Sequence, residues 1–201
     1  MTPNRMILAP ALALLMALPA QAEKLSLSAI SNYFNGITTI EAPFTQRNAD
    51  GSTSSGKLWL KRPHRMRFEY APPERTLVLA AAGNVAIFDA KSNTYAEQYP
   101  LSKTPLSLIL SPRVDLSRAR MVVAHGEDAG QTYVTAQDPD HPEYGQITLF
   151  FANGPIELRR WIVTDEAGSQ TAVDLGPITS GRNYPLNFFS IDALLTKNRE
   201  R

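Results

Sequence analysis

The fold class is decided by residues 57–70, which read KLWLKRPHRMRFEY. Large apolar side chains alternate with charged ones on both sides of a Pro-His pair, a pattern typical of two half-buried strands joined by a turn. Directly paired residues in an antiparallel ladder point to the same side, so the two apolar rows share a face only if an odd number of residues connects them. We therefore predict a hairpin connected by Pro63, His64 and Arg65.

The same alternation continues on both sides of this hairpin, interrupted by Gly, Pro, Asn and Asp residues that favour turns. A length of 201 residues favours one domain. Many short strands at close spacing predict a mainly β protein, with an antiparallel sheet curled into a barrel or folded as a sandwich. The predicted strands are 40–46, 57–62, 65–70, 76–81, 85–89, 94–99, 120–124, 132–136, 146–152, 156–164 and 170–175, and the predicted helices are 24–35, 104–110 and 190–197.

The first 22 residues have the pattern of a secretory signal peptide. Arg5 precedes the apolar run 6–18, and Ala20-Gln21-Ala22 supplies the small residues of a cleavage site. The run is too short to span a membrane, which requires about 20 apolar residues. We expect residues 1–22 to be removed and residues 23–201 to form one domain in the periplasm.

Composition and motifs exclude several functional classes. A formal net charge of +1 argues against a nucleic-acid partner, and the absence of Cys excludes disulfides and thiolate metal sites. The sequence has no Gly-x-Ser-x-Gly elbow, His-Glu-x-x-His zinc motif or Gly-rich phosphate loop. His64, His125 and His141 are expected in or beside turns at the surface. We predict no enzyme activity, no cofactor and no metal.

Two further groups of residues have ordinary interpretations. Residues 138–143 read DPDHPE but lack the ligand alternation of a calcium-binding loop, which favours a solvated turn. Basic side chains alternate with the apolar rows of the hairpin, and we expect them to form its solvent-exposed face, although an acidic partner is an alternative. They are Lys57, Lys61, Arg65 and Arg67.

Arg62 is out of place in this pattern because the alternation puts it on the apolar side, at the rim. A buried guanidinium needs hydrogen-bond acceptors. Either the side chain extends to water, or it donates to the free carbonyls at the C-terminus of a helix. The apolar helix predicted at 104–110 is the candidate.

That helix is short and apolar almost all round. Thr104 is expected to cap it, with Pro105 at the first helical position, and Pro112 stops it. A helix of this kind must be covered or must cover something. It is either a plug that completes the core of a barrel or a lid over a lipid-sized cavity. Its lid residues are Pro105, Leu106, Leu108, Ile109 and Leu110.

Four segments together are similar to those of a known family, the LolA family of periplasmic outer-membrane lipoprotein carrier proteins. Their order and spacing agree from the first predicted helix to about Leu175, and the match is poor after Gly176. The four segments are Phe44-Thr45-Gln46, Gly56-Lys57-Leu58-Trp59-Leu60-Lys61-Arg62-Pro63, Phe68-Glu69-Tyr70-Ala71-Pro72-Pro73 and Thr104-Pro105-Leu106.

The resemblance implies an unclosed antiparallel β-barrel of about eleven strands, with short helices forming a lid over a hydrophobic cavity. It implies that Arg62 is a latch that holds the lid shut in the empty protein. The implied partners are lipoproteins, bound by their acyl chains, an inner-membrane ATP-binding-cassette complex that releases them, and an outer-membrane acceptor or the membrane itself. The expected acyl-chain cavity is lined by Phe44, Leu58, Leu60, Met66, Phe68 and Tyr70.

Two alternatives stay open at this stage. A carrier of free lipid or glycolipid would need the same hydrophobic cavity, and the lining of such a cavity does not identify the headgroup of its ligand. A lipid-sensing module of the same fold normally carries a second domain or a membrane tether. A monomer is the simplest state for a shuttle.

Overall fold

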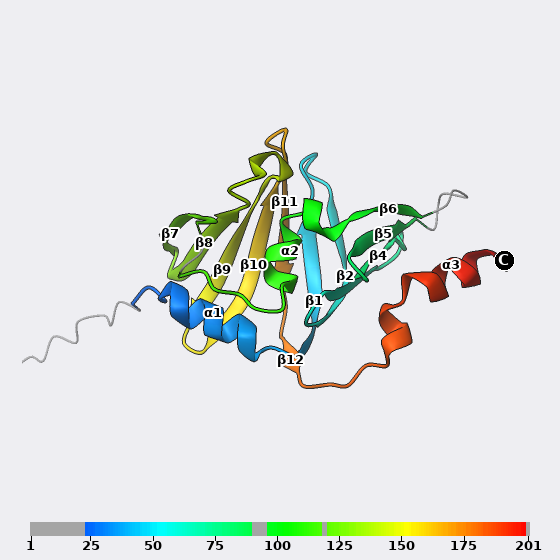
Figure 1. Cartoon of the computed structure of the whole chain (residues 1–201), viewed down its shortest axis with the longest axis horizontal. Coiled ribbons are helices and arrows are strands. Elements are labelled where there is room, and N and C mark those ends of the chain that lie inside the picture. The colour runs from blue at the N-terminus through cyan, green and yellow to red at the C-terminus, as the bar shows by residue number, and fades with distance from the viewer. Residues whose placement is uncertain (1–22, 90–95, 118–119, 200–201) are drawn as a thin grey trace, which may run out of the picture.

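One antiparallel sheet makes up most of the computed structural model, which describes residues 23–89, 96–117 and 120–199 (Figure 1). The predicted signal peptide, 1–22, lies outside the described residues. The strands are β1 (Thr39–Arg47), β2 (Thr53–Lys61), β3 (Arg65–Tyr70), β4 (Leu77–Ala81), β5 (Asn84–Phe88), β6 (Glu97–Pro100), β7 (Val122–Asp128), β8 (Gln131–Gln137), β9 (Gln146–Asn153), β10 (Ile156–Thr164), β11 (Gln170–Leu175) and β12 (Thr179–Ser180).

The strands follow the order β6-β5-β4-β3-β2-β1-β11-β10-β9-β8-β7, and β12 pairs with β1. Because β6 and β7 lie at opposite ends of this order, the sheet does not close. The prediction of a mainly β, unclosed antiparallel fold is confirmed. Residues 94 and 95 of one predicted strand lie outside the described residues, and the two-residue strand β12 was not predicted because it is too short to show a period.

Within the described residues, three α-helices and three short 3₁₀ turns accompany the sheet. They are α1 (Leu27–Gly36), α2 (Leu106–Leu110), α3 (Ile191–Arg199), η1 (Leu101–Lys103), η2 (Pro142–Tyr144) and η3 (Leu186–Phe189). In Figure 1, α1 crosses one end of β9 and β10, α2 lies in front of the middle of the sheet, and α3 lies beside the β2–β5 half. None of the helices in the described ranges is long and apolar enough to cross a membrane.

The helix ends differ from expectation for local reasons. α1 begins at Leu27, not residue 24, because the Ser26 hydroxyl accepts a hydrogen bond from the Ala29 amide at 3.1 Å and so caps the helix. The prediction that Thr104 caps α2 is wrong. The Thr104 hydroxyl instead donates to the Leu101 carbonyl at 2.8 Å, within the preceding 3₁₀ turn, and Pro105 occupies the cap position without a side-chain bond.

The β2–β3 hairpin has the predicted parity but a different register. Leu58 pairs with Phe68 and Leu60 with Met66, so the two apolar rows share a face. The connecting residues are Arg62, Pro63 and His64, not Pro63 to Arg65, because Lys61 pairs directly with Arg65. The predicted register is therefore wrong by two residues along the ladder, a shift that keeps every side chain on its predicted face.

Apolar clusters lie on both faces of this hairpin. Leu58 and Leu60 belong to a large interior cluster that also includes residues of α1 and α2. Trp59, on the opposite face, packs with Phe189 and Ile191 of the C-terminal segment. Burial of both faces explains why this stretch carries bulky side chains at nearly every position.

The sheet is split at one end, next to β12. β1 pairs with β11 only over Phe44–Arg47, and its preceding residues Ile40 and Glu41 pair with β12 instead. β11 leaves the ladder at Gly176, where a Cβ atom would lie 2.7 Å from the Pro43 ring. Because β10 pairs with β11 only from Arg160 onward, the first residues of β10 face a gap rather than a strand.

Candidate functional site

The turn between β2 and β3 binds the C-terminal ends of two helices through Arg62. Its guanidinium donates one hydrogen bond to the Phe34 carbonyl in α1 and another to the Ser111 carbonyl, immediately after α2, at 2.6 Å. The His64 amide adds a bond to the Leu110 carbonyl at 2.9 Å. The last carbonyls of a helix lack the usual intrahelical partner and are available to such donors. The Phe34 carbonyl also accepts from the Ile37 amide at 3.1 Å, so it is shared between the helix cap and Arg62.

The acceptors of Arg62 are all uncharged. Its side chain is partly buried, no carboxylate in the described ranges forms an ion pair with it, and its Nε atom is buried without a hydrogen-bond partner there. Burial lowers the pKa of Arg62, although arginine stays charged at neutral pH. A hydrogen bond to a charged group contributes about 1.5–3 kcal/mol, and the incomplete pairing of a desolvated charge offsets part of this. The contact is therefore favourable but easily broken.

Side chains of α1 also fix the segment that follows α2. The Asn35 amide group donates to the Val114 carbonyl at 2.8 Å and accepts from the Val114 amide at 2.9 Å. One turn earlier, the Ser31 hydroxyl accepts from the Leu116 amide at 2.9 Å. α1, α2 and residues 111–116 thus form one connected layer over the sheet, which we call the cover.

The residues predicted to line a cavity all lie beneath this cover. Five of them are at most 6% exposed, and Tyr70 is partly buried. They belong to or pack against one apolar cluster with Ile30 and Phe34 of α1 and with Ile109 and Leu110 of α2, while Leu106 and Leu108 are partly buried against it. The structure brings together the predicted set Phe44, Leu58, Leu60, Met66, Phe68 and Tyr70.

Aromatic contacts and one side-chain hydrogen bond join β1 to β3 on one wall of this interior. The Phe44 ring lies edge-on to Phe68, with centroids 5.3 Å apart, and to Tyr70 at 5.1 Å. The Tyr70 hydroxyl donates to the Gln46 side-chain oxygen at 2.7 Å. Burial raises the pKa of Tyr70 to about 12, so the hydroxyl is neutral at physiological pH.

The opposite wall was not singled out from the sequence. It consists of buried residues on β8, β9 and β10, and Phe34 of the cover contacts it through Phe151 at a centroid distance of 5.8 Å. The alternation in β9 was the available signal, since every second residue there is buried. The buried residues of this wall include Val134, Ile147, Leu149, Phe151, Leu158 and Trp161.

Comparison with known proteins places this architecture in a family. A sequence model described as "Outer membrane lipoprotein carrier protein LolA" matches residues 35–192. The chain belongs to the LolA family. This is a lipoprotein transport family without a catalytic role, whose carriers are periplasmic. The match covers Arg62, both walls of the interior, α2 and residues 111–116, but only the last two residues of α1.

LolA-family relatives are similar over much of the chain. An outer-membrane lipoprotein carrier protein of Chromohalobacter salexigens is 26% identical over 190 residues, 89% of this chain and 88% of that protein. One of Methylococcus capsulatus is 26% identical over 140 residues, 62% of this chain and 67% of that protein. A Vibrio parahaemolyticus crystal structure, described as a putative outer membrane lipoprotein-sorting protein domain, has a TM-score of 0.50 at 9% identity, covers 84% of this chain and 97% of that one, and supports the fold alone.

Outside the LolA-family interior, residues 179–196 cover the outer face of the hairpin, and we call this segment the strap. Lys61 donates to the Tyr184 carbonyl at 2.9 Å, and Arg67 donates to the Phe188 carbonyl at 2.8 Å and lies over the Phe188 ring. The prediction of a solvent-exposed face is therefore wrong for Lys61 and Arg67, and Arg65 is partly buried, whereas Lys57 is exposed as predicted. The strap docks on the donor groups of Lys61 and Arg67.

Glu41 is the buried charge at the centre of the strap contact. Its carboxylate accepts hydrogen bonds from the Tyr184 hydroxyl and from the Trp59 indole nitrogen, the latter at 3.1 Å. Arg182 and Lys57 lie at ion-pair distances of 3.3 and 3.5 Å. The Tyr184 hydrogen bond, followed by the charges of Arg182 and Lys57, lowers the pKa of Glu41, although burial opposes the shift.

We expect the strap contact to weaken in acid. A carboxyl group whose pKa is lower in the folded than in the unfolded state stabilises the fold above the unfolded value, about 4.3, and this contribution is lost as the pH falls through the folded value. Thermal unfolding followed between pH 7 and pH 3 should therefore show a smaller loss of stability for Glu41→Gln than for the wild type. Parallel curves for the two proteins would rule out this role of Glu41.

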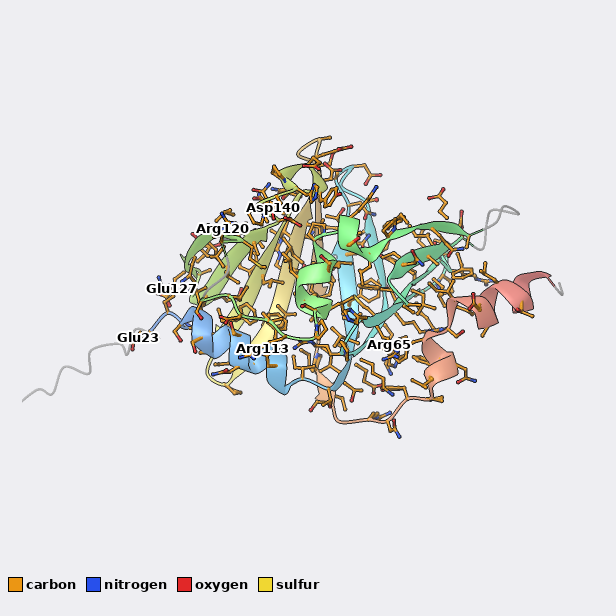
Figure 2. All side chains as sticks on the ribbon, viewed as in Figure 1. Glu23, Arg65, Arg113, Arg120, Glu127 and Asp140 are labelled. Atoms are coloured by element: carbon orange, nitrogen blue, oxygen red, sulfur yellow. The ribbon has the colours of Figure 1, made fainter. Side chains whose placement is uncertain are left out.

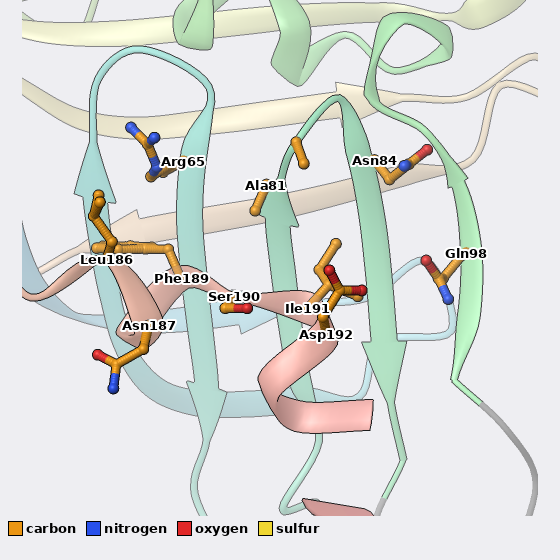
Figure 3. Close-up of a pocket in the computed structure, with 11 residues that line it drawn as sticks. Arg65, Ala81, Asn84, Gln98, Leu186, Asn187, Phe189, Ser190, Ile191 and Asp192 are labelled. Atoms are coloured by element: carbon orange, nitrogen blue, oxygen red, sulfur yellow. The ribbon is translucent and has the colours of Figure 1, made fainter. Parts of the chain in front are cut away.

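A pocket of about 540 Å³ lies between the strap and the β3–β6 end of the sheet (Figure 3). Arg65 and Asn84 line it from the sheet, and Phe189, Ile191 and Asp192 line it from the strap. Mixed polar and apolar walls make it unlike the interior beneath the cover.

Exposed charged residues are spread over the surface of the molecule, as Glu23, Arg113, Arg120, Glu127 and Asp140 show (Figure 2).

The three histidines lie at separate places in the fold. His64 lies in the β2–β3 turn, as predicted, and His141 precedes η2 with its ring 2.9 Å from the Glu143 carboxylate. The expectation of a turn is wrong for His125, which lies within β7 and contacts the Leu25 carbonyl through Nε2 at 2.8 Å. Across residues 23–89, 96–117 and 120–199, no group of three or more His, Asp or Glu side chains is placed to hold a metal ion.

Proposed function

We propose that this protein carries lipoproteins through the periplasm, holding their acyl chains in the apolar interior beneath the cover. The observation that carries the proposal is the position of Arg62, which ties the ends of α1 and α2 to the sheet over a continuous apolar cluster. Membership of a lipoprotein carrier family supports the same role. In this proposal the cover is the lid and Arg62 is its latch.

The energetics of the cargo explain why such a protein is needed. Exposing a methylene group to water costs about 0.8 kcal/mol, so a chain of about 16 carbons costs on the order of 12 kcal/mol. A carrier must cover that surface without covalent chemistry. Packed side chains fill the interior beneath the cover, so loading requires the cover to move away from the sheet.

The closed form also provides a means of release. A ligand that binds only the open form pays the free energy of opening, so a latch lowers its affinity by the same amount. We propose that cargo is accepted from an inner-membrane ATP-binding-cassette complex and delivered to an outer-membrane acceptor or to the membrane itself. Removal of residues 1–22 leaves the carrier in the periplasm, and a monomer suffices for this task.

A carrier of free lipid or glycolipid is the alternative, because the apolar lining of the interior specifies acyl chains rather than a headgroup. The experiment is to incubate purified 23–201 with spheroplasts and to look by immunoblot for triacylated lipoproteins bound to it in the supernatant. ATP-dependent release that requires this protein supports the proposal. Lipoproteins that stay in the membrane, together with a phospholipid or glycolipid found by mass spectrometry in the purified protein, favour the alternative.

A further inference from the structure

The split in the sheet beside β12 contains a pocket of about 430 Å³. This volume lies within the range of about 300–1,000 Å³ that small-ligand sites occupy. Its walls come from the end of α1 and the following residues up to Ile40, from the first residues of β10, and from residues 178–181. The pocket thus lies where β10 has no strand partner on that side.

A side chain replaces the missing strand. The Tyr33 hydroxyl accepts a hydrogen bond from the Leu158 amide at 3.0 Å, an interaction that a neighbouring strand carbonyl normally makes. Tyr33 belongs to the cover, and its ring packs edge-on against Phe151 of the interior at 5.9 Å. One face of Tyr33 therefore contacts the interior, and the same residue lines the pocket.

The lining of the pocket combines polar and apolar groups, and its apolar part is continuous with the interior. Four isoleucines, Ile37, Ile40, Ile156 and Ile178, line the pocket, and all are part of the interior cluster or pack against it. The carboxylate among its lining residues, Glu157, is paired with Arg159 at 3.0 Å. No unpaired charge among its lining residues therefore repels an alkyl chain.

The pocket and the latch share a segment of chain. Arg62 binds the Phe34 carbonyl through its side chain and the Thr38 carbonyl through its amide, the latter at 2.9 Å. Gly36, Ile37 and Thr38, which lie between or at these acceptors, line the pocket. Movement of α1 away from Arg62 must therefore change the pocket wall.

We propose that this pocket, which we call the seam pocket, is a lateral subsite that takes one acyl chain of the cargo when the cover opens. The inference rests on the proposed function, because it assumes a cargo with acyl chains. It assigns a separate place to one chain, beside rather than within the space under α2. Tyr33 is the wall between the two places.

Gly36 lines the seam pocket and has room for a side chain. A Cβ atom added there meets no atom within 4 Å, and the residue is exposed at the end of α1. In Gly36→Leu the new side chain should displace about two methylenes of a bound chain, which lowers affinity about tenfold. Asn32→Leu is the matched control, since Asn32 is exposed on the same helix and does not line the pocket.

The test measures binding of a purified triacylated lipoprotein to the wild type and both variants. A second arm places a photo-crosslinking amino acid at Ser180, which lines the pocket, or at Asn32. A selective loss of affinity in Gly36→Leu with cross-linking from Ser180 alone supports the seam pocket. If the wild type loads lipoprotein but Gly36→Leu binds equally well and Ser180 does not cross-link, the seam pocket is wrong and the carrier role stands. No uptake by the wild type overturns the proposed function and the subsite with it.

Discussion

Arg62→Leu is expected to yield a carrier that loads lipoprotein but passes little of it on. The substitution removes two hydrogen bonds from a charged donor to the ends of α1 and α2, and it replaces a desolvated charge with a side chain that suits the apolar rim. The empty closed form loses stability, whereas a loaded open form does not use these bonds. After the desolvation cost is deducted, the closed form should lose about 1.5–3 kcal/mol of stability. Release of the cargo then becomes about 10- to 100-fold less favourable.

The measurement is transfer of bound lipoprotein to outer-membrane vesicles, with loading measured separately. Arg65→Leu is the matched control, because Arg65 is three residues further along and faces the strap rather than the cover. We expect Arg65→Leu to load and release normally. Normal transfer by Arg62→Leu would show that the guanidinium contact is structural only.

Two buried phenylalanines should have equal effects on the empty protein and different effects on the loaded one. Phe34 belongs to the cover and Phe189 to the strap, and neither is more than 2% exposed. Truncation of a buried phenylalanine to alanine costs about 3–5 kcal/mol. Cargo is expected to replace the packing lost in Phe34→Ala, because acyl chains enter the space that this ring fills. They do not reach the strap.

Urea denaturation with and without bound lipoprotein distinguishes the two cases. Phe34→Ala should recover much of its stability deficit on loading, while Phe189→Ala should retain its deficit. Both variants keep the main-chain carbonyls, so the Arg62 bond to residue 34 remains possible in Phe34→Ala. Equal deficits in the loaded state would mean that the acyl chains do not occupy the interior beneath α1.

The parts of the fold that sequence alone predicts are those with a local period. The alternation in β2 and β3 specified which side chains share a face, and the structure agrees for each of them. The exact register was out of reach because a shift of two residues leaves every side chain on the same side. His125 was misplaced because the predicted strand 120–124 ends one residue before it, whereas β7 continues to Asp128.

Long-range partners were harder to predict than faces. A helix C-terminus was the expected acceptor for Arg62, and the carbonyl after α2 is one of its two partners. The second partner, the Phe34 carbonyl in α1, is available only because the C-terminal ends of α1 and α2 lie close together. The sequence carries no local signal for that proximity. The strap was missed because residues 181–190 have no period, although three aromatic residues within 184–189 indicate a buried contact.

The use of main-chain oxygens as acceptors for Arg62 makes the contact tolerant of mutation. A side-chain acceptor would tie the interaction to one amino-acid type, whereas a carbonyl is present whichever residue stands at that place. Ser111 can therefore be exchanged for many residues without loss of the bond, provided that α2 still ends there. The residues at which the helices of the cover end should therefore matter more for the Arg62 contact than the side chains at those ends.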